Sequence, residues 1–557
     1  MTNDYALVKD RLEKVVRCEV DDKTIPSISY ALVDGNQTVC TGHIRARGTA
    51  EIDAVSNETV FRVGSCSKMF TTIAMMQLAE NGQVDIDVDI STYIPGFHPE
   101  NPFIDPKVGT TKEDAITLRK LMSHTAGMVR EPTVGHYFDD RAPSLAAMVD
   151  SVSSSTLVED PKAKVFKYSN TGIAVVGRAL ELITGRGFNA YVQENVLDPI
   201  GMANSSFTRT AELEAYLASA KMWNVEGDFP APLFDMGGPP AGNLFATVPD
   251  MAEFLKVLLR GGYTIDGKPI LKTETLHSMW ESQSSTGRPG FGYGLGFGVG
   301  TLDGWKTIGH NGAVYGFSTQ CTAVPEAQLG IVMCSTLDGT NAILSRVSQY
   351  ALRLMLAAKG MGKQPPDPVM LQPLTEKQLI AFTGFYRKAD TRETVEVKSR
   401  DGKLYIIDGR MPLRIQPFSE YQLFVNGRVF GPGSEYPYLE VSFAPPGTGE
   451  RVSPSLAWQG VWWNRVPEPT PEQAPEELQP YIGEYGPDFN ITYIFYQGGA
   501  LRCLIEWFFT HSLEKVSETV YRMHGLLYED ETLVFGVRNA DGSSGIKVGP
   551  VFLKRRG

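Results

Sequence analysis

Residues 61–70 have the sequence FRVGSCSKMF, which places Ser65 and Lys68 three positions apart at the start of an apolar segment. Apolar residues recur at helical spacing from Ser65 to about Asn81, so a helix is predicted there. Positions i and i+3 share one face of a helix, and Lys68 is therefore expected beside the Ser65 hydroxyl. A serine hydroxyl needs a neighbouring base, and a lysine partly removed from water has a lowered pKa that suits it to this role. Ser65 is the candidate nucleophile, although the spacing also arises by chance and requires partners downstream.

The first partner motif is Tyr168-Ser169-Asn170, which opens another apolar helix. A tyrosine phenol next to a lysine cation loses its proton more easily, so Tyr168 could pass a proton from Ser65 to the leaving group. The Asn170 amide could fix a substrate carbonyl and hydrogen-bond the lysine. A tyrosine near a helix start is also compatible with simple packing.

The second partner motif is His310-Asn311-Gly312, in a β-rich run whose glycines would let the backbone approach a ligand closely. A strand edge here could align a substrate, and the amide of Ala313 could join that of Ser65 as an oxyanion hole. His310 adds a group that titrates near neutral pH. A lone histidine is equally typical of a structural position.

Composition narrows the class of protein. The chain has 557 residues, 42% hydrophobic and 21% charged, which indicates a globular protein of two to four domains. Its formal charge of -12 argues against a nucleic-acid partner. Residues 1–20 predict a charged amphipathic helix, not a secretory signal, and no run reaches the roughly 18 apolar residues of a membrane span. We therefore expect a cytoplasmic protein without membrane contact.

The cysteines and the common cofactor motifs give no sign of a bound group. Six cysteines are scattered without C-x-x-C spacing, so neither a zinc site nor a disulfide framework is indicated. No paired-histidine or H-E-x-x-H motif is present. Cys66 points about 100° away from Ser65 on a helix and is interpreted as packing. We expect no metal and no cofactor.

Helical and strand patterns alternate up to about residue 358. A hairpin is predicted from residues 25–33 and 38–44, and late strands are predicted at 293–299, 307–322 and 329–335. A helix over residues 116–128 contains His124, interpreted as turn-stabilising. These patterns indicate an α/β domain whose sheet uses both of its chain ends.

Two Pro-rich linkers divide the remainder, which is nearly all short alternating strands. We predict domains at residues 1–365, 374–465 and 478–557. The second and third open alike, with Phe-Thr-Gly-Phe-Tyr ending at Tyr386 and Tyr-Ile-Gly-Glu-Tyr ending at Tyr485, 99 residues apart. This repeat predicts two copies of one small β-barrel module.

The order S-x-x-K, Y-x-N and H-x-G resembles the penicillin-recognising serine hydrolases of the class C β-lactamase and D-aminopeptidase kind. The resemblance covers about residues 25–356 and extends to flanking segments such as ITLRKLMSHTAGM, GYGLGFGV and PEAQLGIVM. It implies a β-lactamase-like α/β (α+β) domain with a central antiparallel sheet flanked by helices. It also implies that Ser65 is acylated and that Lys68 and Tyr168 share the base and acid work. Asn170 and His310 would flank the substrate.

Two differences from the motifs of that family limit which of its activities are expected here. His310 stands where β-lactamases usually carry the lysine of K-T-G, so a permanent cation for a β-lactam carboxylate is missing. The second motif is Y-x-N, not S-D-N, so a separate deacylating glutamate does not apply. Efficient β-lactam hydrolysis is therefore not the expected activity.

The architecture resembles the three-domain D-aminopeptidases, which carry two lipocalin-like all-β antiparallel barrels after the catalytic domain. In that family a loop of the last barrel reaches the active site and selects substrates with a free amino terminus. The comparable loop is residues 538–547, where Asp541 could pair with an ammonium. Asp541-Gly542 is equally a plain hairpin turn.

We therefore expect a serine hydrolase that cleaves amide or peptide bonds through an acyl-enzyme on Ser65, of the D-aminopeptidase or D-amino-acid-amide peptidase kind. The alternative is an esterase or acyltransferase of the same fold. A β-lactamase or a non-catalytic penicillin-binding sensor ranks below both. The expected partner is a small-molecule or short-peptide substrate. The oligomeric state stays open, with a homodimer as one arrangement.

Overall fold

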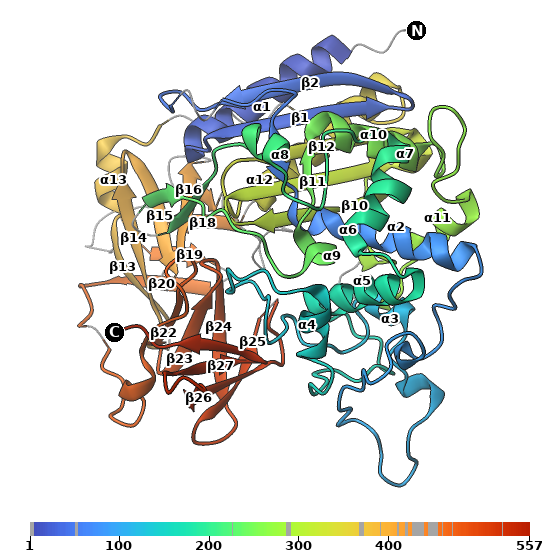
Figure 1. Cartoon of the computed structure of the whole chain (residues 1–557). Coiled ribbons are helices and arrows are strands. Elements are labelled where there is room, and N and C mark those ends of the chain that lie inside the picture. The colour runs from blue at the N-terminus through green and yellow to red at the C-terminus, as the bar shows by residue number, and fades with distance from the viewer. Residues whose placement is uncertain are drawn as a thin grey trace.

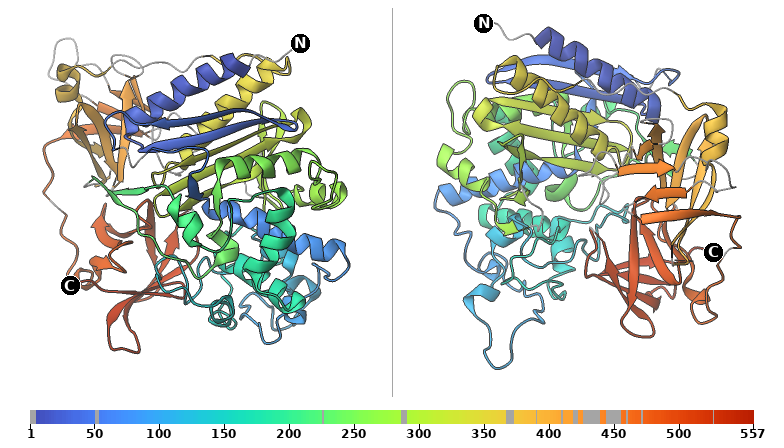
Figure 2. Two further views of the ribbon diagram at one scale, coloured as in Figure 1. Left: turned by 45° about the horizontal axis from the view of Figure 1, so that its top comes forward. Right: turned by 180° about the vertical axis from the view of Figure 1, so that it is seen from behind.

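The computed structural model describes residues 5–50, 54–224, 227–285, 291–366, 373–389, 391–408, 411–417, 422–425, 439–443, 455–458, 461–470, 472–525 and 527–557. Three parts built on sheets follow one another along the chain (Figure 1). Both the barrel and the last sheet lie against the large N-terminal part, as the two further views show (Figure 2).

The N-terminal part is built on an eight-stranded antiparallel sheet with the order β2-β1-β12-β11-β10-β9-β8-β7. Its strands are β1 (Ser27–Asp34), β2 (Gln37–Arg45), β7 (Ser284–Ser285), β8 (Gly292–Tyr293), β9 (Gly298–Leu302), β10 (Trp305–Val314), β11 (Phe317–Val324) and β12 (Leu329–Ser335). Strand β1 pairs with β12 from Ile28 opposite Ser335 to Asp34 opposite Leu329. The prediction that the sheet uses both chain ends is confirmed.

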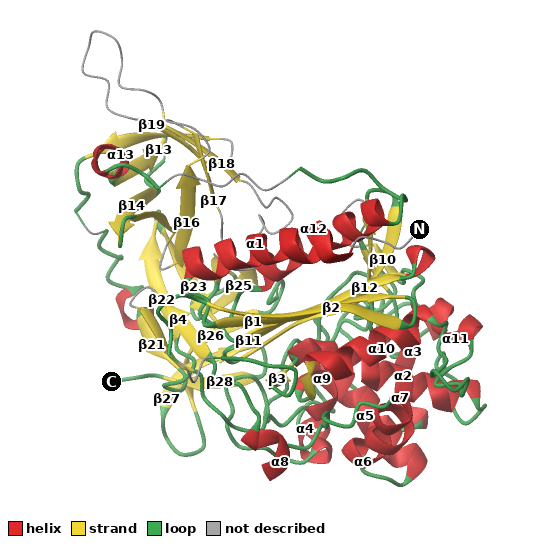
Figure 3. Cartoon of the chain, turned by 90° about the horizontal axis from the view of Figure 1, so that it is seen from above, coloured by secondary structure: helices red, strands yellow, loops and turns green. Residues whose placement is uncertain are grey.

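Two helices, α1 (Tyr5–Lys23) and α12 (Asn341–Ala358), lie side by side on one face of this sheet (Figure 3). The other face carries α2 (Ser67–Glu80), α3 (Leu118–Met122), α4 (Leu145–Asp150), α5 (Asn170–Thr184), α6 (Phe188–Val192), α7 (Asp198–Ile200), α8 (Ala211–Ala215), α9 (Pro239–Gly242), α10 (Val248–Leu259) and α11 (Thr273–Met279). Because α12 and α10 cover β12 from both sides, all seven of its residues are buried. This explains why its sequence is continuously apolar instead of alternating.

Two short antiparallel strand pairs lie outside the eight-stranded sheet. Strand β3 (Val60–Arg62) pairs with β6 (Phe245–Thr247), and β4 (Lys221–Asn224) pairs with β5 (Gly227–Pro230). Because β3 immediately precedes the Ser65 turn, its pairing with β6 fixes where that turn begins. In the described part of the chain, no helix has the length and apolar character that crossing a membrane requires.

The second part is a closed antiparallel barrel preceded by α13 (Glu376–Phe382). Its strands are β13 (Gly384–Lys388), β14 (Thr394–Arg400), β15 (Lys403–Asp408), β16 (Met411–Pro417), β17 (Gln422–Val425), β18 (Leu439–Phe443), β19 (Ser455–Trp458) and β20 (Val461–Val466). The barrel closes because β13 pairs with both β14 and β20.

The third part is an eight-stranded antiparallel meander that forms half a barrel. Its strands are β21 (Gly483–Tyr485), β22 (Thr492–Gln497), β23 (Ala500–Ile505), β24 (Phe509–Lys515), β25 (Val520–His524), β26 (Thr532–Arg538), β27 (Ser544–Val548) and β28 (Val551–Lys554). Its two ends meet at a single bridge between Tyr485 and Arg555. The expected class, a β-lactamase-like domain followed by two antiparallel β modules, is confirmed.

The repeated sequence at the start of the two modules has one structural role in both. The hydroxyl of Tyr386 donates to the carbonyl of Phe382 over 2.9 Å. The hydroxyl of Tyr485 donates to the carbonyl of Tyr481 over 2.8 Å, again four residues upstream. Both tyrosines are buried, so each hydrogen bond pins the entering chain to the first strand of its module.

Three predicted elements end earlier than expected or are interrupted by a turn. Helix α3 stops at Met122 because His124 and Gly127 adopt positive φ values of 58° and 70°, which end the helix. The expected strand at 293–299 is divided into β8 and β9, since Gly296 turns the chain at φ 79°. The run at 307–322 is a hairpin that turns at Gly316, with φ 84°.

Candidate active site

Ser65 lies in a short 3-10 turn, Gly64–Cys66, that leads directly into α2. The Ser67 hydroxyl donates to the carbonyl of Gly64 over 2.6 Å and accepts from the amide of Leu244 over 3.0 Å. The thiol of Cys66 is buried and points to the carbonyl of His310, so it packs as expected. These bonds hold the turn rigidly at the helix start.

Lys68 and Tyr168 both contact the Ser65 hydroxyl. Lys68 Nζ lies 3.0 Å from Ser65 Oγ, and the Tyr168 hydroxyl donates to the same oxygen over 2.7 Å. Lys68 Nζ also donates to Asn170 Oδ1 over 2.8 Å and to the carbonyl of Ala241 over 2.7 Å. The structure thus brings together four of the residues that the motifs singled out.

The protonation state of Lys68 follows from its surroundings. The side chain is fully buried, and burial, together with the positive charge of Arg130, lowers its pKa well below the usual value. A neutral amine has two N–H groups and one lone pair. The two carbonyl oxygens of Asn170 and Ala241 use the two N–H groups, because neither oxygen can donate. The lone pair then faces the Ser65 hydroxyl, as a general base requires.

Tyr168 corrects one expectation. The sequence suggested that a neighbouring lysine cation would ease loss of the phenolic proton, but burial raises the pKa of Tyr168 above its usual value. The hydrogen bond to Ser65 and the charge of Arg130 lower it by less. Burial also lowers the pKa of Lys68, which weakens the cation that the expectation relied on. Tyr168 is therefore a neutral phenol that donates a hydrogen bond to Ser65 Oγ.

Glu131 is a site residue that sequence reasoning missed. Its Oε1 accepts from Asn170 Nδ2 over 2.6 Å, which fixes the Asn170 carbonyl oxygen toward Lys68. The carboxyl is buried, and burial raises its pKa to about 7 against the opposing charge of Arg130. Glu131 lies in the irregular segment after α3, where its sequence neighbours carry no motif.

His124 lies behind Tyr168 and is buried. Its Nδ1 accepts from the backbone amide of Ser169 over 3.2 Å, and its ring lies 4.5 Å from that of Tyr168 and 4.9 Å from that of Tyr293. These contacts fit a residue that supports the turn and the tyrosine, as expected for its position.

His310 is buried on β10 and is neutral. Its Nδ1 lies 2.5 Å from the carbonyl of Asn311, which can only accept, so Nδ1 carries the proton. Its Nε2 then accepts from the Tyr293 hydroxyl over 2.8 Å. Burial is the main cause that lowers the pKa of His310 to about 3. His310 is therefore a neutral, hydrogen-bonded ring in the wall of the site.

Two glycines allow β10 to approach the nucleophile turn. Gly64 has φ 55°, and a Cβ there would lie 2.8 Å from Ala313 N. A Cβ on Gly312 would lie 1.9 Å from the carbonyl oxygen of Val63 and 3.0 Å from Ser65 N. The backbones of Ser65 and Ala313 thus lie side by side, as an oxyanion hole made from their amides requires.

The same strand offers an open edge to a substrate. Strand β9 pairs with β10 only from Trp305 to Gly309, so it leaves the segment from His310 to Val314 uncovered. Asn341 donates to the carbonyl of Gly312 over 2.8 Å and steadies this segment. An extended substrate could align along it by backbone hydrogen bonds.

Asp541 lies in the exposed turn between β26 and β27. Its carboxylate accepts from the hydroxyl and the amide of Ser543 over 2.6 and 2.9 Å. These are the contacts of a plain hairpin turn. Other segments of the last sheet, carrying Glu506 and Glu531, contact the N-terminal part at Arg130.

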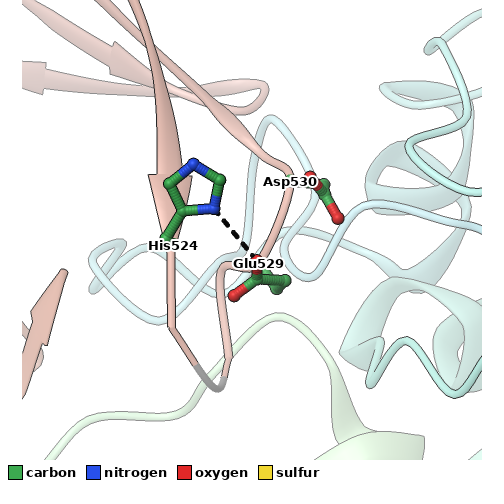
Figure 4. A group of neighbouring side chains, drawn as sticks. All are labelled: His524, Glu529 and Asp530. Atoms are coloured by element: carbon green, nitrogen blue, oxygen red, sulfur yellow. Dashed lines mark hydrogen bonds and ion pairs between the residues drawn. The ribbon is translucent and has the colours of Figure 1, made fainter. Parts of the chain in front are cut away.

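A histidine and two acidic side chains lie close enough together to be considered as a metal site (Figure 4). They are His524, the last residue of β25, and Glu529 and Asp530, which precede β26. Both ring nitrogens of His524 are already engaged, with Glu529 at 3.1 Å and Glu514 at 2.9 Å. The cluster is partly exposed and is explained by these ion pairs.

Comparison with known families identifies the N-terminal part. The family model described as Beta-lactamase matches residues 12–353, which is more than half of the chain and includes Ser65, Lys68, Tyr168 and His310. The chain belongs to the beta-lactamase family. Members of this beta-lactamase fold are serine hydrolases, so the expected resemblance and the general reaction class are confirmed.

Individual members of the beta-lactamase family are distant in sequence. Penicillin-binding protein 4 of Amycolatopsis lactamdurans is 27% identical over 331 residues, covering 57% of this chain and 81% of the relative. The octameric penicillin-binding protein homologue from Pyrococcus abyssi has a TM-score of 0.55 at 20% identity and covers 82% of this chain and 99% of its own. The D-amino acid amidase of Ochrobactrum anthropi SV3 has a TM-score of 0.50 at 19% identity, covering 63% and 99%. The two solved structures share the fold.

Proposed function

We propose that the protein is a serine hydrolase that cleaves amide or peptide bonds next to a free amino group, through an acyl-enzyme on Ser65. The observation that carries the proposal is the continuous chain of hydrogen bonds from Ser65 through Lys68 and Asn170 to the buried carboxyl of Glu131. The first two links support nucleophilic catalysis. The last supplies an acid that could receive the substrate's ammonium.

The geometry supports the following acylation sequence. Neutral Lys68 takes the proton of Ser65 as Oγ attacks the carbonyl carbon, and the Ser65 and Ala313 amides stabilise the oxyanion. Tyr168 gives its proton to the leaving nitrogen as the carbon–nitrogen bond breaks, and Lys68 returns a proton to Tyr168 across the shared site. Water then attacks the ester carbonyl as Lys68 takes one of its protons, and Lys68 passes that proton to Ser65 Oγ as the carbon–oxygen bond breaks, which releases the acid and free Ser65.

Glu131 supports a preference for substrates with a free amino group. Its carboxyl is hydrogen-bonded to Asn170, so a substrate ammonium reaching this end of the site would meet a buried anion. In a low-dielectric environment, pairing with a cation strongly favours the ionised carboxyl. Binding an ammonium would therefore lower the pKa of Glu131 from about 7 and stabilise the complex.

The D configuration is proposed for the substrate from the likeness to one solved structure. The solved relative from Ochrobactrum anthropi is a D-amino acid amidase in complex with D-phenylalanine, and the two chains share the fold. His310, held neutral, offers no cation for the carboxylate of a β-lactam. This supports small amides over β-lactams as substrates.

Covalent labelling tests the nucleophile. A fluorescent phosphonate is expected to add once to the wild-type chain, by intact mass, and not to Ser65→Ala. Lys68→Ala and Tyr168→Phe are expected to reduce acylation by about two to four orders of magnitude, the usual contribution of a positioned base or acid. Lys268→Ala, an exposed lysine in an ion pair with Asp266, is the matched control and should react normally. Equal labelling of Ser65→Ala would refute the nucleophile.

Substrate comparison tests the specificity. D-alanine p-nitroanilide is expected to be turned over faster than its N-acetyl derivative and than L-alanine p-nitroanilide. Glu131→Gln should remove the preference for the free amine and leave the reaction with the N-acetyl derivative nearly unchanged. Equal rates with the free and the acetylated amine in the wild type would contradict the role of Glu131.

An esterase or acyltransferase is the second candidate, because the uncharged surroundings of His310 and Tyr293 suit a neutral acyl group as well. Turnover of p-nitrophenyl butyrate without any anilide cleavage would favour this candidate and reject the peptidase.

A further inference from the structure

We propose that the last sheet, β21–β28, is part of the catalytic apparatus: Glu506 on this sheet is a positioning residue that holds Arg130 against Tyr168. The proposal goes beyond the choice of substrate, since it concerns how the acid of the site is held. It depends only on Ser65, Lys68 and Tyr168 acting together.

The link between the two parts is a buried two-pronged ion pair. Arg130 Nε and Nη2 donate to Glu506 Oε1 over 3.2 and 3.0 Å, and Nη2 also donates to Oε2 over 3.1 Å. The Tyr528 hydroxyl donates to Glu506 Oε1 over 2.7 Å. Arg130 and Glu506 are 5% and 7% exposed, so water competes little for these bonds.

Arg130 transmits this anchoring to the site in two ways. Its guanidinium lies over the Tyr168 ring, 5.7 Å from the centroid. Its carbonyl oxygen accepts from the amides of Asn170 and Thr171 over 2.9 and 3.1 Å, at the first turn of α5. The ion pair with Glu506 therefore fixes both the proton donor and the helix start that carries Asn170.

Glu531, a second carboxylate of the last sheet, also contacts the N-terminal part. Glu531 Oε1 accepts from the amide of Arg130 over 2.8 Å and lies 3.0 Å from Lys167 Nζ. Lys167 is buried and immediately precedes Tyr168. The segment before Tyr168 and the loop beside it are thus both tied to the last sheet.

The turn that carries Glu506 has an unfavourable backbone conformation. Glu506 and Trp507 both have positive φ, 52° and 66°, which is unfavourable for residues with a Cβ. The turn persists because Trp507 and Phe508 insert into the core of the N-terminal part, where Trp507 contacts Phe229 and Phe508 contacts Trp223. Strained backbone held by tertiary contacts is characteristic of functional sites.

The groups around Arg130 and Tyr168 determine how the site would respond to losing the Glu506 charge. Facing them from the N-terminal part are Lys68, His124, Glu131, Lys167, Tyr293 and His310. Facing them from the last sheet are Glu506, His511, Tyr528 and Glu531. Removing the Glu506 charge leaves Arg130 with its longer ion pair to Glu131, 3.6 Å from Nε to Oε1, and favours the deprotonated form of the neighbouring groups. Both limbs of the pH profile of kcat/KM should then move to lower pH.

The test is Glu506→Gln in the full-length chain, with ethyl butyrate as substrate. Its alkoxide leaving group needs a proton from Tyr168, and the result does not depend on the preferred amide. We expect kcat/KM to fall about ten- to hundredfold, mainly through kcat, because the proton donor is misplaced. Both pH limbs should shift down by about half a unit or more. Glu514→Gln, an exposed carboxylate on the same sheet, is the matched control and should keep wild-type values.

A double variant, Arg130→Gln with Glu506→Gln, separates the effect of the local charge on the pH profile from the effect of residue positioning on kcat. It removes the buried pair together, so the pH limbs should return to wild type while kcat stays low. Wild-type kcat/KM and pH limbs in Glu506→Gln would overturn the proposal. So would a loss of activity with unmoved limbs, since that indicates only general destabilisation. If Glu506→Gln does not fold, the double variant decides: low kcat supports the positioning role, and wild-type kcat overturns it.

Discussion

Gly312→Ala is expected to damage acylation through the backbone alone. The added Cβ would lie 1.9 Å from the carbonyl oxygen of Val63, whereas ordinary contact begins at 3.4 Å. Strand β10 and the Ser65 turn would therefore have to separate by about 1.5 Å. Gly312 does not have a positive φ, so alanine introduces no backbone strain of its own. The whole effect comes from moving the Ala313 amide away from the Ser65 amide.

Loss of one oxyanion donor costs about 10²–10³ in rate, and a displacement of this size is enough to remove one. We expect Gly312→Ala to lower the acylation rate by that factor, measured as the pre-steady-state burst with a p-nitrophenyl ester. Thermal unfolding should show a loss of about 1–3 kcal/mol from overpacking. Gly187→Ala is the control, because a Cβ there meets nothing within 4 Å. A burst rate within twofold of wild type in folded Gly312→Ala would refute the oxyanion assignment.

Three further outcomes are expected. The pKa of Glu131, about 7, lies above the ordinary 4.5, so the folded state binds this proton more tightly and stability falls as pH rises between those values. Glu131→Gln should therefore be more stable than wild type at pH 8, by up to about 3 kcal/mol, and not at pH 4, as urea unfolding at both pH values checks. With the pKa of His310 at about 3, His310→Gln should keep both pH limbs of kcat/KM, and a lost limb between pH 5 and 8 would contradict the neutral role. Tyr485→Phe loses a hydrogen bond and should lower the free energy of unfolding by about 1 kcal/mol, with Tyr386→Phe matching it in urea unfolding.

Local patterns predicted the parts of the site that are set by local geometry. The three-residue spacing of Ser65 and Lys68 fixes their contact within one helical turn, and the glycine of the His310 motif is needed where β10 approaches that turn. The sequence also predicted that the sheet uses both ends of the domain, because a hairpin pattern precedes the helices and strand patterns follow them. Burial is not a local property, however. The pKa of Tyr168 depends on the segments that bury it, and no local sequence pattern indicates which segments these are.

The residues that sequence reasoning missed are those brought in by distant segments. Glu506 meets Arg130 across 376 positions, and neither residue belongs to a recognisable motif. For the last sheet, the sequence left residues 538–547 as either a loop that reaches the site or a plain hairpin turn. The segment that reaches the site is instead the strained turn after β23, whose positive φ values at Glu506 and Trp507 contradict local preference. Sequence rules fail here because tertiary contacts override them.

The pair of Arg130 and Glu506 shows why such a contact would be retained. Burial and, after it, the charge of Arg130 lower the pKa of Lys68, but an unpaired guanidinium next to Tyr168 would be costly to bury. Glu506 removes that cost without contacting Lys68 itself. A buried ion pair adds little net stability compared with apolar residues, because desolvation offsets the attraction. The pair should therefore matter more to the rate than to folding, and the variant that neutralises both residues should unfold near the wild-type midpoint while remaining slow.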